Sequence, residues 1–240
     1  MRIVFMNIML KVVTIVILLA TATACMQNDN PVWYFFDEPA IVTYNGSSVV
    51  LKTPYEPYPA PELDGSGLVE GQCLISTFIL DYANSPLVAS VINCFDVHNS
   101  QVEVRSGAME DDFTDSIASA QILPRYVDAM LFFSFKPHTA VENAMYQYEL
   151  VCNTDSITLG SNGKSVYGMY FRSKNVASGG AESQENKYYY AFDLGEFART
   201  YQEDSLYINF YYYTKTHQDE EIYTAFKENP VRYKFPVPSK

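Results

Sequence analysis

Basic residues are scarce in this chain of 240 residues. It has 16 Lys and Arg against 28 Asp and Glu, for a formal net charge of −12 at pH 7. A nucleic-acid-binding surface needs a basic footprint, and so does direct adhesion to anionic lipid. We therefore expect no nucleic acid partner and interpret the acidic surface mainly as one that keeps the protein soluble.

Residues typical of catalytic and metal centres are also few. The three histidines, His98, His138 and His217, do not lie at metal-ligand spacing from one another or from a cysteine. The sequence has no phosphate-binding glycine loop and no Gly-x-Ser-x-Gly motif. We therefore expect no enzyme activity, no catalytic residue, no metal and no cofactor. A glycan-active enzyme on a β scaffold is an alternative, because carboxylates are plentiful enough for a glycosidase pair.

A long uncharged segment occurs near the N-terminus. Val12–Ala22 is eleven residues long, too short for a membrane-spanning helix of about 20 residues. It fits the apolar core of a secretory signal, and Arg2 and Lys11 supply the basic start. Removing this segment as a signal peptide over residues 1–24 leaves 14 basic and 28 acidic residues, a net charge of −14.

The apolar segment ends in Ala22-Thr23-Ala24-Cys25, which resembles the lipobox of bacterial lipoproteins. The resemblance implies diacylglycerol on the Cys25 thiol, a palmitate-type membrane anchor and a tether over residues 25–38. The polar Met26–Asn30 loosely resembles the export signal of surface lipoproteins in Bacteroidota-type bacteria. We expect a lipid anchor in the outer membrane, with the body at the cell surface or on the periplasmic side. An ordinary signal peptide cleaved near Ala24 is the alternative.

Three cysteines remain in the mature chain: Cys73, Cys94 and Cys152. The odd number leaves at least one without a partner in the same chain. If Ala83-Asn84 forms the turn between the apolar runs Gly71–Tyr82 and Leu87–Val97, then Cys73 faces Cys94 across a strand pair. This register makes the two a candidate disulfide. The alternative is two small buried hydrophobic residues.

The rest of the sequence predicts strands separated by turns, which is typical of a sandwich or barrel. Asn45-Gly46 inside Val42–Val50 favours a hairpin with a type I′ turn, and the four prolines of Pro54–Pro61 exclude a central strand there. Residues 110–123 are compatible with a short helix or a strand, and Pro124 is the predicted domain boundary. In the second half we expect strands at Val127–Phe135, Met145–Val151, Val166–Phe171, Tyr188–Phe192, Leu206–Tyr213, Ile222–Phe226 and Val231–Phe235.

One short helix interrupts these strands. Asp193-Leu194-Gly195-Glu196 has the form of a capping box, and Phe197, Ala198 and Tyr201 give the following turn an apolar side.

Tyrosine is abundant, with 20 residues. Alternation along Leu206–Tyr213 places Tyr207, Tyr211 and Tyr213 on the face opposite the apolar side chains. Such a face is a candidate contact surface for a glycan or a protein. Ordinary aromatic pairing between neighbouring strands is the alternative.

An Asp-Ser-apolar motif occurs three times and contains Ser116, Ser156 and Ser205. It resembles the O-glycosylation acceptor of exported Bacteroidota-type proteins. Ser156 is the strongest candidate because we expect it in a loop. The alternative is that Asp-Ser simply begins strands and turns.

These features together resemble the NigD-like lipoproteins. The resemblance rests on the lipobox, the aromatic cluster Trp33–Phe36, the segment Pro39–Thr43, Gly71 before a long strand, and an all-β second half. It implies an OB-like β domain over residues 39–123 and a β-sandwich or barrel domain over residues 124–240. We therefore expect a non-enzymatic cell-envelope lipoprotein that binds a protein or glycan partner. A glycan-active enzyme remains an alternative, as does a pilus-like assembly subunit that donates Val231–Phe235 as a strand.

Overall fold

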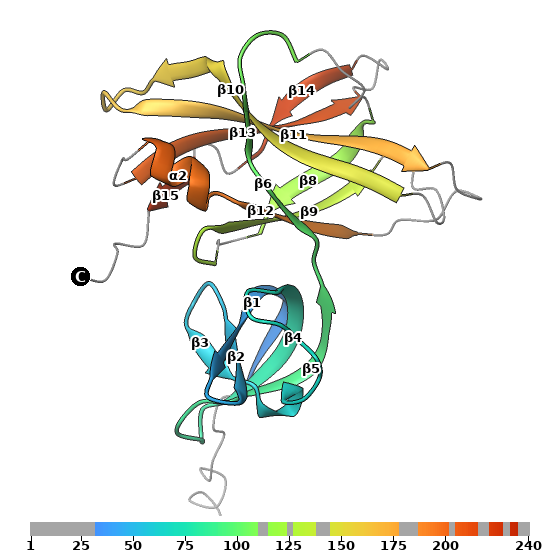
Figure 1. Ribbon diagram of the computed structural model, residues 1–240, viewed down its shortest axis with the longest axis vertical. Helices are drawn as coiled ribbons and strands as arrows, with labels where there is room; N and C mark the ends of the chain where they lie inside the picture. Colours follow the sequence, from blue (N-terminus) through green and yellow to red (C-terminus); the bar gives the residue numbers. More distant parts are fainter. Residues whose placement is uncertain are drawn as a thin grey trace, which may run out of the picture.

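The computed structural model describes residues 32–109, 115–123, 127–137, 145–177, 187–201, 205–215, 221–227 and 231–234. These residues form mostly strands, and one short α-helix lies among them, which confirms the predicted all-β class. The predicted signal peptide and Cys25 lie outside the described residues. Two bodies follow one another along the long axis of the molecule (Figure 1).

The first body is a curled antiparallel sheet of five strands in the order β3-β2-β1-β4-β5. Its strands are β1 (Val32–Asn45), β2 (Ser48–Lys52), β3 (Pro57–Pro59), β4 (Cys73–Asp81) and β5 (Ala89–Asp96). Leu51, Leu74 and Phe78 are fully buried in the core that the sheet encloses. A 3₁₀ turn, η1 (Pro61–Leu63), lies between the outer strands, where Glu62 accepts a 2.9 Å hydrogen bond from the Val91 N–H. The sequence predicted an OB-like domain in this part of the chain.

Local turn chemistry accounts for the first hairpin. Asn45 pairs with Ser48, so the loop consists of Gly46 and Ser47. Gly46 has a φ of +66° and Ser47 has a negative φ, which fits a type II′ turn better than the predicted type I′ turn. The proline-rich segment contributes only β3, a strand at the end of the sheet, as the missing proline N–H groups require.

Strand β1 begins earlier than the sequence predicted. Val32–Phe35 pair with β4, and a bulge between Phe35 and Glu38 contains Asp37 at a φ of +51°. Residues 32–38, expected to form part of the tether, are therefore strand. Continuation of the β4 pairing explains the difference, because β4 offers partners as far as Asp81.

The candidate disulfide between Cys73 and Cys94 is wrong for this structure. Cys94 lies opposite Ser76 rather than Cys73, because the turn is longer than expected and a bulge follows Thr77. The resulting register places Cys73 against the second body and Cys94 against the core of the first body. All three described cysteines are free thiols.

The second body is a sandwich of two sheets. Sheet B has the order β6-β12-β9-β8, and sheet C has the order β14-β13-β11-β10-β7, with β15 also paired to β13. The strands of sheet B are β6 (Asn99–Gln101), β8 (Ile117–Ile122), β9 (Met130–Pro137) and β12 (Tyr188–Asp193). Those of sheet C are β7 (Glu103–Arg105), β10 (Met145–Leu159), β11 (Ser165–Ala177), β13 (Ser205–Lys215), β14 (Glu221–Ala225) and β15 (Val231–Lys234).

Strand pairing moves the domain boundary. β6, β7 and β8 were expected in the first domain, yet they pair with β12, β10 and β9 respectively. The first body therefore ends near Val97, whereas the sequence predicted Pro124, which lies between β8 and β9. Pro124 comes between two strands of the same sheet. The boundary lies earlier because the strands within residues 99–122 pair with strands that come later in the chain.

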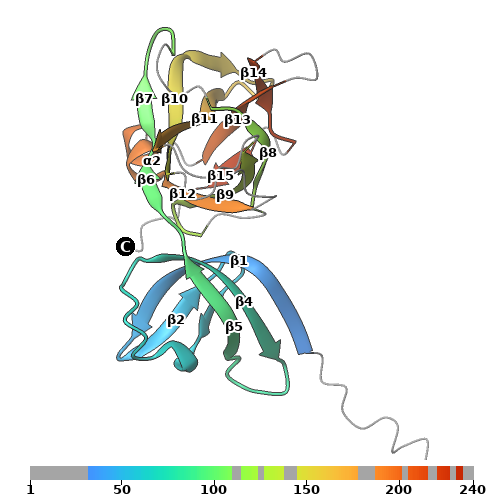
Figure 2. The ribbon, with the colours of Figure 1, turned by 90° about the vertical axis from the view of Figure 1, so that its right-hand side faces the viewer.

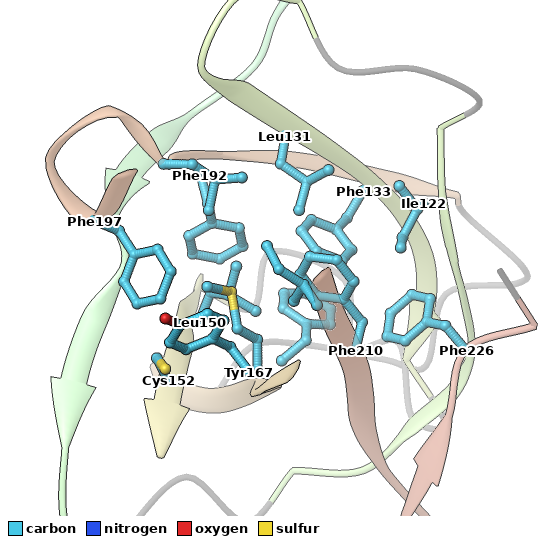
Figure 3. Close-up of a cluster of buried hydrophobic side chains, with 14 of the residues drawn as sticks. Ile122, Leu131, Phe133, Leu150, Cys152, Tyr167, Phe192, Phe197, Phe210 and Phe226 are labelled. Carbon is cyan, nitrogen blue, oxygen red and sulfur yellow. The ribbon is translucent and has the colours of Figure 1, made fainter. Parts of the chain in front are cut away.

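The core between sheets B and C is strongly aromatic (Figure 3). The Phe133 ring lies 5.1 Å from Phe171 and 5.7 Å from Phe210, measured between centroids. Helix α2 (Gly195–Tyr201) covers one end of this core with Phe197 and Ala198. Asp193 Oδ1 accepts a 2.7 Å hydrogen bond from the Gly195 N–H, in agreement with the predicted acidic residue at the start of the helix.

The central strand β9 of sheet B is buried on both faces, because the first body packs on the outer side of the sheet (Figure 2). Phe132 and Ala191, both 0% exposed, point toward the first body, whereas Phe133 points into the sandwich core. On the side of the first body, the same cluster contains Ile41, Cys73, Ile75 and Val97. The two bodies therefore share this hydrophobic cluster, which is separate from the core of each body.

Candidate functional site

The outer face of sheet C carries the predicted tyrosines. Leu206, Ile208 and Phe210 of β13 are fully buried in the sandwich core, so the alternate residues Tyr207, Tyr211 and Tyr213 lie on the opposite face. The neighbouring strands add Tyr170 and Tyr223, which pair directly with Tyr211 and Tyr213. We call these five residues the tyrosine face: Tyr170, Tyr207, Tyr211, Tyr213 and Tyr223.

Ring contacts link four residues of the tyrosine face: Tyr170, Tyr211, Tyr213 and Tyr223. Tyr170 and Tyr211 stack with centroids 5.0 Å apart and planes 18° from parallel. Tyr223 meets Tyr170 edge-on at 4.9 Å and Tyr213 at 5.2 Å. Such pairs contribute about 0.5–1.5 kcal/mol beyond area burial. All five side chains are half-buried, so the cluster is a partly exposed aromatic surface with preset ring positions.

Tyr207 lies at the other end of β13, opposite Arg232 of β15. The Arg232 guanidinium carbon lies 5.7 Å from the Tyr207 ring centroid, within reach of a cation–π interaction. The strand pairing of β15 also bears on the assembly-subunit alternative. Val231–Lys234 pair with β13 inside their own sheet, so they do not form a terminal strand that leaves the body.

A buried ion pair borders the tyrosine face, and the sequence analysis did not single it out. Arg172 follows Tyr170 by two residues on the same face, and its Nη1 lies 2.8 Å from Glu149 Oε1. The second carboxylate oxygen of Glu149 lies 2.9 Å from Arg105 Nη2, which also lies 2.6 Å from Glu103 Oε2. The Arg172 and Glu149 side chains are only 2% and 5% exposed.

The sequence signal for this pair is the presence of charged residues in otherwise buried strand segments. Glu149 is followed by buried Leu150, and Arg172 follows buried Phe171. Their direct pairing across β10 and β11 depends on register, which a single sequence does not specify. The network links β7, β10 and β11 beside the tyrosine face, and removing one partner of a buried ion pair is strongly unfavourable.

The three Asp-Ser motifs have different surroundings. Ser116 is 9% exposed and therefore largely buried. Ser156 lies within β10 rather than in a loop, where the pairing with β11 is interrupted after Asn153. Its hydroxyl donates a 2.7 Å hydrogen bond to the Asn153 carbonyl and lies against Gly168. Ser205 begins β13 and pairs with Lys234. Glycosylation of these residues stays a prediction.

A small pocket lies at the edge of sheet B. It has a volume of about 150 Å³, and its lining residues are Ser119, Ala120, Gln121, Ser134, Phe135, Lys136 and Lys187. No carboxylate is among its described lining residues. A glycosidase site would need two such groups, so this pocket lends no support to the glycan-active enzyme alternative.

The described part of the chain has neither a candidate metal centre nor a membrane-spanning helix. No group of three or more His, Cys, Asp or Glu residues there is placed to hold a metal ion. His138 and His217 lie outside that part. No described helix combines the length and the hydropathy needed to cross a bilayer.

No protein-family model matches the chain, and no curated protein matches it. Solved structures do match over most of its length. An uncharacterized protein from Parabacteroides merdae is 11% identical with a TM-score of 0.60, covering 83% of this chain and 99% of the other. A candidate lipoprotein from Bacteroides fragilis is 11% identical with a TM-score of 0.58, covering 87% and 99%.

A NigD-like immunity protein from Bacteroides caccae also matches. It is 10% identical with a TM-score of 0.52, and the match covers 86% of this chain and 98% of the other. At these identities the likeness concerns the fold. The chain thus shares its fold with a NigD-like protein, as the resemblance seen in the sequence implied.

Proposed function

We propose that this chain is a non-enzymatic lipoprotein of the cell envelope that binds a protein partner through the tyrosine face. In this proposal Cys25 carries the lipid, the anchor lies in the outer membrane, and the body is exposed at the cell surface. The clustering of Tyr170, Tyr211, Tyr213 and Tyr223 on the outer face of sheet C is the observation that supports the binding role most directly.

The packing of the tyrosine face favours a protein over a glycan. Tyrosine supplies a large amphipathic contact area at a low cost in conformational entropy, and aromatic residues dominate the energetics of protein interfaces. Stacking on each other removes one face of Tyr170 and one face of Tyr211 from contact with a sugar ring. Their edges and hydroxyl groups remain for contacts with polar and apolar groups of a protein surface.

The fold supports the anchor in a more general way. The Bacteroides fragilis structure shares the arrangement of both bodies and is described as a candidate lipoprotein. This chain has Ala22-Thr23-Ala24-Cys25 seven residues before β1 begins at Val32. A tether of this length would hold the first body close to the membrane.

Site-specific photocrosslinking in the native cells tests the binding role. A photoreactive residue at Tyr211 is expected to capture one protein, whereas the same residue at Leu159, which is 77% exposed on β10, captures none of it. With the purified partner, Tyr170→Ser/Tyr211→Ser should weaken binding at least roughly tenfold, because interface hot spots each contribute about 2 kcal/mol or more. Equal capture from both positions would contradict the proposal.

Intact-mass analysis of protein purified from its native membrane tests the anchor. A diacyl or triacyl mass is expected that is absent from the Cys25→Ala form. Additional hexose-like mass would support glycosylation at the Asp-Ser motifs. An unmodified chain beginning at or after Cys25 would remove the membrane anchor from the proposal.

A further inference from the structure

The aromatic side chains with the highest exposure in the described chain gather at the start of β1. Phe36 is 68% exposed, Tyr34 is 58% exposed and Trp33 is 55% exposed. Val32 and Tyr82 are exposed beside them, at 46% and 42%. We call these five residues the aromatic end of β1. Large exposed apolar side chains are unremarkable one by one, but a contiguous group indicates a surface that contacts something.

Both faces of the strand are apolar at this end. Tyr34 and Phe36 stack on one face with centroids 6.1 Å apart and planes 11° from parallel. On the other face, Trp33 contacts Tyr82 at 5.7 Å. Phe35 turns instead into the core, where it stacks on Phe78 at 4.9 Å. A strand end that is aromatic on two sides suits immersion in an apolar medium better than packing against one flat protein surface.

The charges nearest to this end already have partners. Residues 32–36 carry none. Asp37 accepts a 2.7 Å hydrogen bond from the Tyr189 hydroxyl of the second body, and Asp81 accepts a 2.9 Å hydrogen bond from the Ala83 N–H. These donors are neutral, so Asp81, which lies opposite Val32, keeps its negative charge. Such a charge is compatible with the hydrated headgroup region but would be costly in the hydrocarbon core.

The aromatic end lies close in the chain to the proposed lipid anchor, which favours the membrane as the surface that it contacts. Seven residues, 25–31, precede Val32, and a chain of that length spans at most about 25 Å when fully extended. Figure 2 shows this end of β1 pointing away from the second body. Trp and Tyr are the side chains enriched at the boundary between lipid and water.

We infer that the aromatic end of β1 lies in the headgroup region of the membrane when Cys25 is lipidated. This inference rests on the proposed lipid anchor and adds a second, non-covalent contact with the same bilayer. The contact uses aromatic side chains rather than basic ones, which is consistent with the acidic composition of the chain, and it sets the orientation of the body on the membrane. A zwitterionic lipid such as phosphatidylcholine is sufficient for it.

Trp33 is the single tryptophan of the chain, so its fluorescence reports on this surface alone. Full-length lipidated protein is reconstituted in phosphatidylcholine vesicles and recovered by flotation. Relative to the Cys25→Ala form in buffer, we expect emission at shorter wavelength, loss of most iodide quenching, and quenching by lipids brominated near the headgroup. Floated protein whose Trp33 is still quenched by iodide would overturn the inference while leaving the anchor intact.

Variants separate the aromatic contact from the anchor. In Tyr34→Ser/Phe36→Ser, flotation should persist because the acyl chains supply it, while Trp33 emission returns toward that of the protein in buffer. Leu159→Ser, an equally drastic change of an exposed residue on the other body, should alter neither readout. Loss of flotation in the unaltered protein would overturn both proposals. A concentration-dependent blue shift of Cys25→Ala without lipid would assign the surface to a second copy of the chain.

Discussion

The Tyr189 hydroxyl donates a 2.7 Å hydrogen bond to Asp37 Oδ2 and so links β12 of the sandwich to the bulge of β1. The Tyr189 ring also contacts Phe95 of β5 at 5.4 Å. Burial and the neighbouring Asp37 carboxylate raise the pKa of Tyr189 above its usual range. This contact lies at the rim of the shared hydrophobic cluster that joins the two bodies.

Tyr189→Phe removes this hydrogen bond and retains the ring contact. We expect the free energy of unfolding to fall by about 0.5–1.5 kcal/mol, the usual net contribution of one such bond. A double-mutant cycle with Asp37→Asn, followed by urea denaturation, measures the coupling between the two residues. Full additivity of the two single changes would contradict a direct interaction.

Phe132→Ala opens a cavity between the two bodies. Phe132 is 0% exposed on the outer side of sheet B, and truncation of a buried phenylalanine costs about 3–5 kcal/mol. We expect calorimetry to show a lower melting temperature and two separated transitions where the unaltered protein shows one. A single transition at the original temperature would argue against the shared cluster.

We expect replacement of one residue of the Glu149–Arg172 pair to destabilise the protein more than replacement of both. Glu149→Gln removes the carboxylate charge that lies 2.8 Å from the Arg172 guanidinium, which is 2% exposed, and should destabilise the protein by about 3–5 kcal/mol. Replacing both residues, as Glu149→Leu/Arg172→Met, should recover most of that loss because no buried charge remains. Chemical denaturation measures both variants. A double variant less stable than the single one would show that the pair is net stabilising.

The three thiols should react slowly in the folded protein. Burial raises the pKa of Cys73 to about 11 and that of Cys152 to about 12, so little reactive thiolate forms at neutral pH. The half-buried Cys94 should react first with an aromatic disulfide reagent, and all three should react after unfolding. A native mass about 2 Da below the fully reduced value would instead indicate a disulfide.

The same thiols make the protein sensitive to alkali. Because their pKa values in the folded state lie above the ordinary value of 9.0, the unfolded chain loses these protons first. Their contribution to stability is therefore complete below about pH 9 and decreases as the pH rises toward 11 and 12. Denaturation curves recorded across this range should show a weaker pH dependence for Cys152→Ala. An unchanged slope would contradict the assignment.

Local patterns predicted much of this structure. Alternation in β13 correctly separated Phe210 from Tyr211, and the acidic residue before α2 was found at Asp193. What failed depends on partners distant in the chain. A longer turn changed the register that had paired Cys73 with Cys94, and β7 found its neighbour in β10, almost fifty residues later. The Glu149–Arg172 pair was missed for the same reason, since cross-strand register brings those residues together.

The two apolar faces of sheet B also limit how this chain can be divided. Produced alone, the sandwich would expose Val127 and Phe132 to water, and the curled sheet would expose Ile41 and Ile75. Each half would then expose a contiguous apolar surface, which promotes aggregation. Truncation, domain exchange or fusion at the junction should therefore give insoluble material. We therefore expect the stretch from β1 to β15 to fold as one unit.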